Sequence, residues 1–208
     1  MSDRLNHLLE QANSQPLNIE ASEKFAAYLT LLQKWNARTN LTAVRDEEGI
    51  LSRHFLESIL CARALPQSLP TLLDLGSGAG FPGLPIAILR PEISITLAES
   101  QHKKAAFLRE AARTLNLPNV RVHAERAETL PTRFSAITLR AVDKMSEALP
   151  IAIRLLEPEG LLALLTTTTD SPILQQLAET EFPFTWQPLV PLQKNTIRVL
   201  LLGRKNTV

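Results

Sequence analysis

The stretch TLLDLGSGAGFPG, residues 71–83, constrains the fold of this chain more than any other feature of its sequence. Its first half is a short apolar run, which is typical of a buried strand. Glycines then recur at Gly76, Gly78 and Gly80, where they let the backbone turn tightly and leave no Cβ between the main chain and a ligand. Pro82 suits the start of a helix, because the first turn does not use the N–H group that proline lacks. The stretch therefore predicts a strand, a glycine loop and a helix N-terminus, with which α/β proteins hold nucleotide-like cofactors.

The apolar pattern of the rest of the chain predicts helices first and then strands that alternate with helices. Helical spacing up to about residue 65 predicts one helix that ends within 36–40 and another over 47–65. From residue 71 onward we expect strands at 71–76, 94–99, 120–123, 135–140, 161–167, 184–190 and 197–202, and helices at 82–90, 102–116, 148–156 and 173–178. Such alternation is typical of a Rossmann-like α/β fold with a mostly parallel sheet. The short connection between the last two strands favours a hairpin, and thus an antiparallel edge strand.

Composition restricts the class of protein. The prolines at Pro66 and Pro70 mark a junction, so we expect a helical extension over 1–65 and a cofactor-binding domain over 66–208. A net charge of +1 gives no strong signature of nucleic-acid binding, although a local basic patch remains compatible with it. Cys61 is the only cysteine, which excludes an intrachain disulfide and a multi-cysteine metal site. No signal peptide or membrane-spanning run is apparent, so we expect a soluble, cytoplasmic protein.

Two acidic residues stand at the ends of expected strands. Asp74 can accept hydrogen bonds from loop N–H groups or from a cationic group of a ligand, or it can simply be the polar end of a buried strand. Glu99 ends the second strand, where an acid is well placed to bind the ribose hydroxyls of an adenosine moiety.

Residues 78–83 also match G-x-G-x-x-G, so a dinucleotide is a competing cofactor. In the dinucleotide fingerprint, however, the first glycine follows the strand directly and the helix opens within the motif. Here the loop already begins at Gly76, and Pro82 stands where the helix should be running. The pattern acid-x-G-x-G-x-G therefore favours S-adenosylmethionine, which has no pyrophosphate for a helix N-terminus to hold. An NAD-dependent oxidoreductase remains the alternative enzyme.

A set of segments in fixed order makes the interpretation more specific. They are NLTAV at 40–44, Arg53-His54, DLGSGAGFPG at 74–83, Glu99-Ser100, Lys103-Lys104, Phe107-Leu108 and Arg140-Ala141. Together they resemble the RsmG (GidB) family of bacterial 16S rRNA (guanine-N7)-methyltransferases, from about Trp35 to Arg140. The resemblance implies a class I methyltransferase fold that uses S-adenosylmethionine, with the N-terminal helices on the side that faces RNA. It also implies methyl transfer to N7 of one guanosine of 16S rRNA, position 527 in the standard rRNA numbering.

The resemblance assigns the cofactor site residue by residue. The positions that match the family's S-adenosylmethionine contacts are Gly76, Phe81, Ala127, Glu128 and Arg140, and Gly78 and Glu99 belong to the same pocket. This chain departs from the family pattern at three places. Leu139 precedes Arg140 where serine is usual, Glu57 stands where aspartate is commoner, and the threonines at 166–169 replace a Lys-Gly pair.

The chemistry implied by the resemblance needs no general base. Guanine N7 has an in-plane lone pair and no proton to lose, so methyl transfer requires alignment and charge stabilisation. We therefore assign no catalytic base and no metal ligand. We expect 16S rRNA or the small ribosomal subunit as the partner, no membrane contact, no obligate protein partner and a monomeric enzyme.

The target guanine must be unstacked or presented in a loop before its N7 can meet the methyl group. The side chains that we expect to hold RNA are Arg38, Asn40, Arg45, Arg53, His54, Lys103 and Lys104, with Arg109 and Arg113 as further phosphate contacts. Each has a structural alternative: a solvated helix face for the cations, a helix cap for Asn40 and a packed core residue for His54. Arg140 has the alternative of a buried ion pair. A ribosome-assembly factor that binds RNA without turnover is the non-enzymatic alternative.

Overall fold

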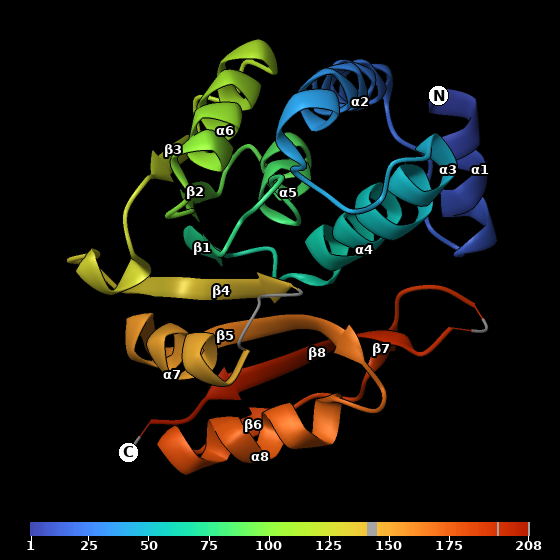
Figure 1. The fold of residues 1–208 in the computed structure, drawn as a ribbon. Coiled ribbons are helices and arrows are strands. Elements are labelled where there is room, and N and C mark those ends of the chain that lie inside the picture. The colour runs from blue at the N-terminus through green and yellow to red at the C-terminus, as the bar shows by residue number, and fades with distance from the viewer. Residues whose placement is uncertain (141–144, 195, 208) are drawn as a thin grey trace.

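The strands of the computed structural model form an eight-stranded sheet with helices on both faces (Figure 1). The structure describes residues 1–140, 145–194 and 196–207, so Ala141, which belongs to the family resemblance, lies outside the described residues. The strands are β1 (Thr71–Leu75), β2 (Ser94–Ala98), β3 (Val120–His123), β4 (Phe134–Arg140), β5 (Leu156–Thr167), β6 (Phe184–Trp186), β7 (Val190–Pro191) and β8 (Arg198–Lys205). Their order is β3-β2-β1-β4-β5-β8-β6, and β7 pairs with β8 beside this path.

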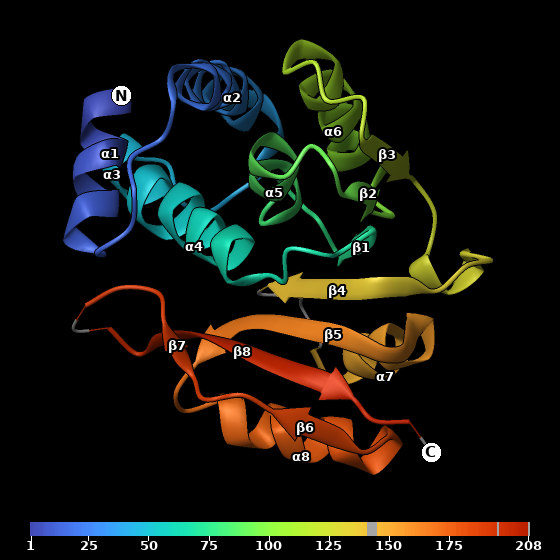
Figure 2. The same ribbon diagram turned by 180° about the vertical axis from the view of Figure 1, so that it is seen from behind.

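The sheet is parallel from β3 to β5 and antiparallel beyond it. Figure 2 shows β8 running opposite to its neighbour β5. The prediction of a mostly parallel sheet with an antiparallel edge is confirmed, and β6 and β8 lie side by side as expected. The continuous strand expected at 184–190 is wrong, because it forms two short strands, β6 and β7. Proline has no N–H for the ladder; Pro188 lies between β6 and β7, and Pro191 is the last residue of β7.

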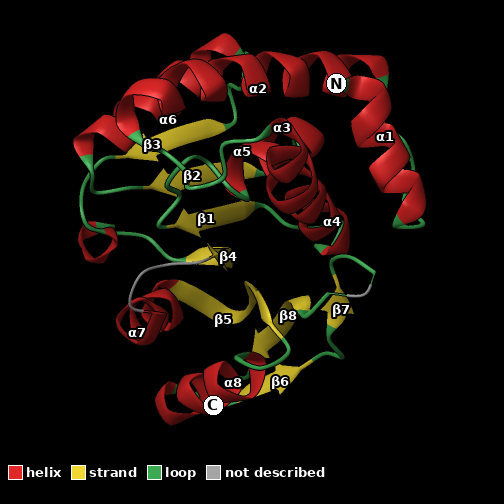
Figure 3. Cartoon of the chain, turned by 45° about the vertical axis from the view of Figure 1, so that its right-hand side comes forward, coloured by secondary structure: helices red, strands yellow, loops and turns green. Residues whose placement is uncertain are grey.

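Helices precede the sheet and connect its strands (Figure 3). They are α1 (Ser2–Gln11), α2 (Ile19–Thr39), α3 (Glu47–Gly49), the π-helix η1 (Ile50–Leu56), α4 (Glu57–Ala64), α5 (Gly83–Leu89), α6 (His102–Thr114), the 3-10 turn η2 (Ala127–Thr129), α7 (Met145–Leu155) and α8 (Ser171–Glu181). The helix predicted at 47–65 is thus a composite of α3, η1 and α4. The helix that we expected to end within 36–40 is α2, which ends at Thr39.

Alternate residues of the central strands point to opposite faces of the sheet and build a core on each. On one face, Leu72 and Ala136 pack with α1, α2, η1, α4, α5 and α6. On the other face, Leu73 and Ile137 pack with α7 and α8. The N-terminal helices therefore share a core with α5 and α6 across the junction at residue 66. Within the described ranges, no helix is both long and apolar enough to cross a membrane.

Candidate active site

A cavity of 640 Å³ opens beside the carboxyl ends of β1, β2 and β4. Its lining comes from the segment 41–44, Arg53 and His54 of η1, the glycine loop 76–79 with Phe81, the segment 99–101, Lys104 and Arg140. A smaller cavity of 240 Å³ lies against the same wall and shares Gly76, Glu99 and Ser100 with it. The chain leaves β1 toward β2 on one side and returns to β4 on the other. Ligands of open α/β sheets bind at such a switch point.

Glu99 fixes the shape of the wall between the two cavities. One carboxylate oxygen accepts a hydrogen bond from the Gly78 N–H at 3.0 Å, and the other accepts one from the Gln101 N–H at 2.8 Å. The carboxylate thereby ties the glycine loop to the N-terminus of α6. Its position at the boundary of both cavities is compatible with the ribose contact expected from the sequence, which stays a prediction.

Asp74 has a structural role instead of a ligand-facing one. Its side chain is buried and accepts hydrogen bonds from the Gly83 N–H at 3.2 Å and from the Thr138 hydroxyl at 2.8 Å. The expected bond to a loop N–H is therefore present, at the first residue of α5. Asp74 does not line either cavity, so the expected contact with a cationic ligand group has no support. Burial raises the pKa of Asp74 to about 6.

This raised pKa predicts a pH dependence of folding stability. In the unfolded chain Asp74 titrates near 3.8, so between pH 4 and 6 the folded state binds the additional proton. The contribution of Asp74 to stability therefore falls as the pH rises through this range and stays low above it. Asp74→Asn should remove that fall. The free energy of unfolding of the variant relative to the wild type should rise by about 2 kcal/mol between pH 4 and 6, as measured by urea unfolding. Parallel curves for the two proteins would contradict the prediction.

The residues assigned to the cofactor by resemblance converge on the paired cavities. Gly76 and Glu99 border both cavities, and Ala127 and Glu128 border the smaller one. The remaining three, Gly78, Phe81 and Arg140, border the larger one. Segments distant in the sequence thus meet at one place, which is where the resemblance requires a cofactor to bind.

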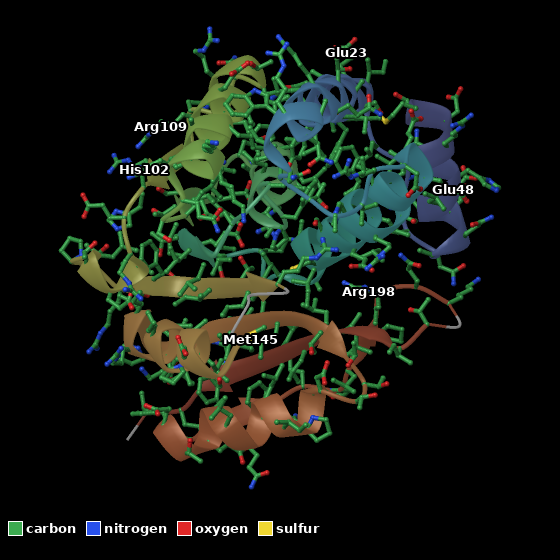
Figure 4. The ribbon with its side chains drawn as sticks, viewed as in Figure 1. Glu23, Glu48, His102, Arg109, Met145 and Arg198 are labelled. Carbon is green, nitrogen blue, oxygen red and sulfur yellow. The ribbon has the colours of Figure 1, made fainter. Side chains whose placement is uncertain are left out.

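Arg140 lies in a buried ion pair and at the cavity at the same time. Its Nη2 lies 2.9 Å from Oε2 of Glu57 and also donates to the Arg53 carbonyl, while Nη1 lies 3.5 Å from the Ser58 hydroxyl. The same Glu57 carboxylate accepts a hydrogen bond from Arg198 at 2.8 Å, and Arg198 extends from β8 toward α4 (Figure 4). Burial lowers the pKa of Arg140 to about 10, so its guanidinium stays charged at neutral pH. The ion pair named as a structural alternative is therefore real, and it places a cation at the cavity wall.

His54 combines packing with a place in the cavity lining. Its ring stacks on Phe81 at 4.7 Å between centroids, and its Nε2 lies 2.7 Å from the Thr42 hydroxyl. Burial and the neighbouring Arg140 lower the pKa of His54 to about 3. The imidazole is therefore neutral at physiological pH, and the expectation of a packed, hydrogen-bonded histidine is confirmed.

The other expected RNA contacts separate into two groups. Arg53 and Lys104 line the larger cavity together with His54. The rest lie outside both cavity linings on exposed positions: Arg38, Asn40, Arg45, Lys103, Arg109 and Arg113. Asn40 ends α2 with a left-handed backbone, φ 48°, so the helix-cap alternative is confirmed. Its side chain accepts a hydrogen bond from Arg45 at 2.8 Å.

The sequence did not identify the roles of several residues at this site. Ser100 and Gln101 line the cavity, Glu57 pairs with Arg140, and Arg198 pairs with the same Glu57 carboxylate. The signal for Glu57 was its position inside the apolar run FLESIL at 55–60, because a carboxylate in such a run needs a charged partner. Thr166 and Thr167, which replace the Lys-Gly pair of the family, line a separate cavity of 490 Å³ with α7, α8 and Arg198.

Comparisons with known proteins agree on one class. The model of the GidB family, described as rRNA small subunit methyltransferase G, matches residues 21–190. The ribosomal RNA small subunit methyltransferase G of Roseiflexus sp. (strain RS-1) is 43% identical, over 75% of this chain and 73% of that one. Among solved structures, the ribosomal protein L11 methylase of Lactobacillus delbrueckii subsp. bulgaricus has a TM-score of 0.62 at 12% identity, covering 73% of this chain and 77% of its own. A SAM-dependent methyltransferase from Aquifex aeolicus has a TM-score of 0.59 at 16% identity, covering 78% and 95%.

Proposed function

The chain belongs to the GidB family of rRNA small subunit methyltransferases, and from that premise we propose that it methylates N7 of one guanosine in 16S rRNA. The methyl donor is S-adenosylmethionine. The single observation that best supports the proposal is the convergence of every expected cofactor residue on the paired cavities at the switch point of the sheet. We propose position 527 in the standard rRNA numbering as the target.

The side chains that line the two cavities suit S-adenosylmethionine. The Glu99 carboxylate can accept hydrogen bonds from the ribose hydroxyls, and Ala127 and Glu128 border the adjoining space for the adenine. The charged Arg140, which lines the same cavity as the glycine loop, would suit the carboxylate of the methionine part. When bound, the sulfonium supplies an activated methyl group.

The described residues then have to bind and align the guanine. Methylation at N7 leaves a positive charge on the purine, and no proton has to be removed from N7. The neutral His54 adds no opposing charge to this wall of the cavity, and Glu57 compensates the charge of Arg140. Arg53 and Lys104 at the same cavity are suited to hold phosphates of the RNA.

The N-terminal part of the chain supports this arrangement. Residues 41–44, Arg53 and His54 all come from the segment 1–65 and line the larger cavity. We therefore propose that this segment faces the RNA and that residues 66–208 bind the cofactor. We also propose that the enzyme acts in the cytoplasm as a monomer, since one chain supplies the lining of both cavities.

Arg140→Ala should lower kcat/KM for methyl transfer by about 100-fold, because the carboxylate of the cofactor's methionine part would lose its proposed cationic partner. The fold should persist, since Arg198 still neutralises Glu57. Radiometric methyl transfer and a thermal melt measure the two effects. Arg154→Ala, an exposed position of α7 outside both cavities and not among the expected RNA contacts, is the matched control and should behave as the wild type. Unchanged kinetics of Arg140→Ala would remove this residue from the site.

The proposed function is tested by tritiated methyl transfer. The substrates are small ribosomal subunits from cells that lack this modification and, in parallel, the naked 16S rRNA. We expect the label in a single N7-methylguanosine of at least one substrate. If S-adenosylmethionine binds and neither substrate is labelled, the cofactor assignment survives and the RNA assignment is wrong.

A further inference from the structure

The hydroxyl group of Tyr28 holds the glycine loop one residue after the position that Glu99 holds. Tyr28 lies in α2, has no exposed surface, and donates a hydrogen bond to the Ala79 carbonyl at 2.5 Å. Ala79 stands between Gly78 and Gly80 and lines the larger cavity. The loop is therefore anchored at Gly78 by Glu99 and at the next residue by a side chain from the N-terminal segment.

The position of the Tyr28 ring is fixed by its neighbours. It stacks on Phe55 and on Phe81 at 5.2 Å between centroids in each case, and on Phe107 at 6.4 Å. A Cβ added at Gly80 would lie 2.8 Å from the Tyr28 hydroxyl oxygen, so the loop packs directly against this group. Burial raises the pKa of Tyr28 well above its ordinary value, which keeps the hydroxyl protonated as a donor.

The loop needs such an anchor because glycine flanks Ala79 on both sides. Gly78 and Gly80 both have a positive φ, at 57° and 91°, and glycine moves between backbone regions at little cost. The peptide groups around Ala79 can therefore rotate unless the carbonyl is held. The Tyr28 hydroxyl is placed to hold it in the orientation that shapes the cavity.

We propose that Tyr28 is a positioning residue for the cofactor, which sets the glycine loop for S-adenosylmethionine through the Ala79 carbonyl. The inference rests on the proposed function, because it takes this loop as the cofactor site. It means that the segment facing the RNA also determines the affinity for the methyl donor.

Tyr28→Phe removes the hydroxyl and keeps the ring in the aromatic cluster. We expect the dissociation constant and the KM for S-adenosylmethionine to rise about tenfold, as for the loss of one buried hydrogen bond. The kcat at saturating cofactor and the KM for the RNA should stay within about twofold of the wild type. A general loss of stability would not weaken cofactor binding while leaving kcat and the KM for RNA unchanged. Calorimetry below the melting temperatures of both proteins measures the binding.

Trp35→Phe is the matched control. Trp35 lies in the same helix, and its Nε1 donates to Glu110 of α6 at 3.1 Å, away from the glycine loop. This variant also loses an aromatic hydrogen bond between elements, but its affinity for S-adenosylmethionine should equal that of the wild type. An equal loss of affinity in both variants would overturn the proposal.

A second measurement leaves the protein unmutated. Tyr28 is the only tyrosine of the chain, so labelling with fluorotyrosine gives a single ¹⁹F resonance. We expect addition of S-adenosylmethionine to shift it, because the Ala79 carbonyl lies against the hydroxyl. If the resonance does not move and Tyr28→Phe binds S-adenosylmethionine with wild-type affinity, the role of Tyr28 is wrong, while the proposed function is unaffected. A wild-type protein that does not bind S-adenosylmethionine would overturn the proposed function with it.

Discussion

Replacing Gly76 with arginine should abolish both S-adenosylmethionine binding and methyl transfer. Gly76 has φ 73°, a backbone region that residues with a side chain adopt at a cost. It also borders both cavities, so a long side chain there would enter the space that the cofactor is proposed to fill. We expect no heat of binding in calorimetry and no label transferred to the small subunit.

Gly76→Ala separates the two causes of this effect. Alanine brings the same backbone strain, which costs about 1–2 kcal/mol, but leaves the cavities largely open. It should weaken binding partially, whereas arginine should remove it. The far-ultraviolet circular dichroism of both variants checks that the sheet remains. Wild-type affinity of Gly76→Arg would contradict the assignment of this loop to the cofactor.

The second large effect is expected at Glu57. Its carboxylate is fully buried and pairs with both Arg140 and Arg198, whose side chains are 6% and 24% exposed. Glu57→Ala would leave both guanidinium groups without their carboxylate. Removing one member of a buried ion pair costs about 3–5 kcal/mol. Urea unfolding should show a loss of this size.

The controls for Glu57 come from the same chain. Glu57→Asp keeps the charge, with one methylene less, and should fall between the wild type and the alanine variant. Glu20→Ala removes a carboxylate that pairs with Lys24 at 2.9 Å on the surface, and it should cause little measurable change in stability. If Glu57→Ala were as mild as Glu20→Ala, the buried pair would have no stabilising role.

Local pattern was enough to predict the elements that surround the site. The strand at 120–123 has the predicted bounds, and β1 and β2 each end one residue earlier than expected. The π-helix η1 was not predicted, because a seven-residue change of helical period leaves no distinct signal in the spacing of apolar residues. The division into β6 and β7 was not predicted either, because their boundaries depend on pairing with β8 and on two prolines.

Side-chain partners far apart in the sequence could not be predicted from pattern. Arg140 and Glu57 are 83 positions apart, and Arg198 and Glu57 are 141 apart. Only the folded sheet brings β4 and β8 to the same end of α4. The glycine loop and Glu99 were predicted from local pattern, and Phe81, Ala127, Glu128 and Arg140 from the family resemblance. Tyr28 lay outside the matched segments and was seen only as a contact of the loop.

The position of β8 also determines when the sheet can be completed during synthesis. β8 pairs with β5 and separates it from β6, although both of these strands precede it in the chain. A nascent chain that emerges from its N-terminus can form the parallel half of the sheet early, while the edge of β5 stays unpaired until residues 198–205 are made. Unpaired edges of this kind are sites of aggregation. Ribosome stalling or premature termination before residue 198 should therefore yield aggregation-prone chains, even though the glycine loop and its surroundings have already been synthesised.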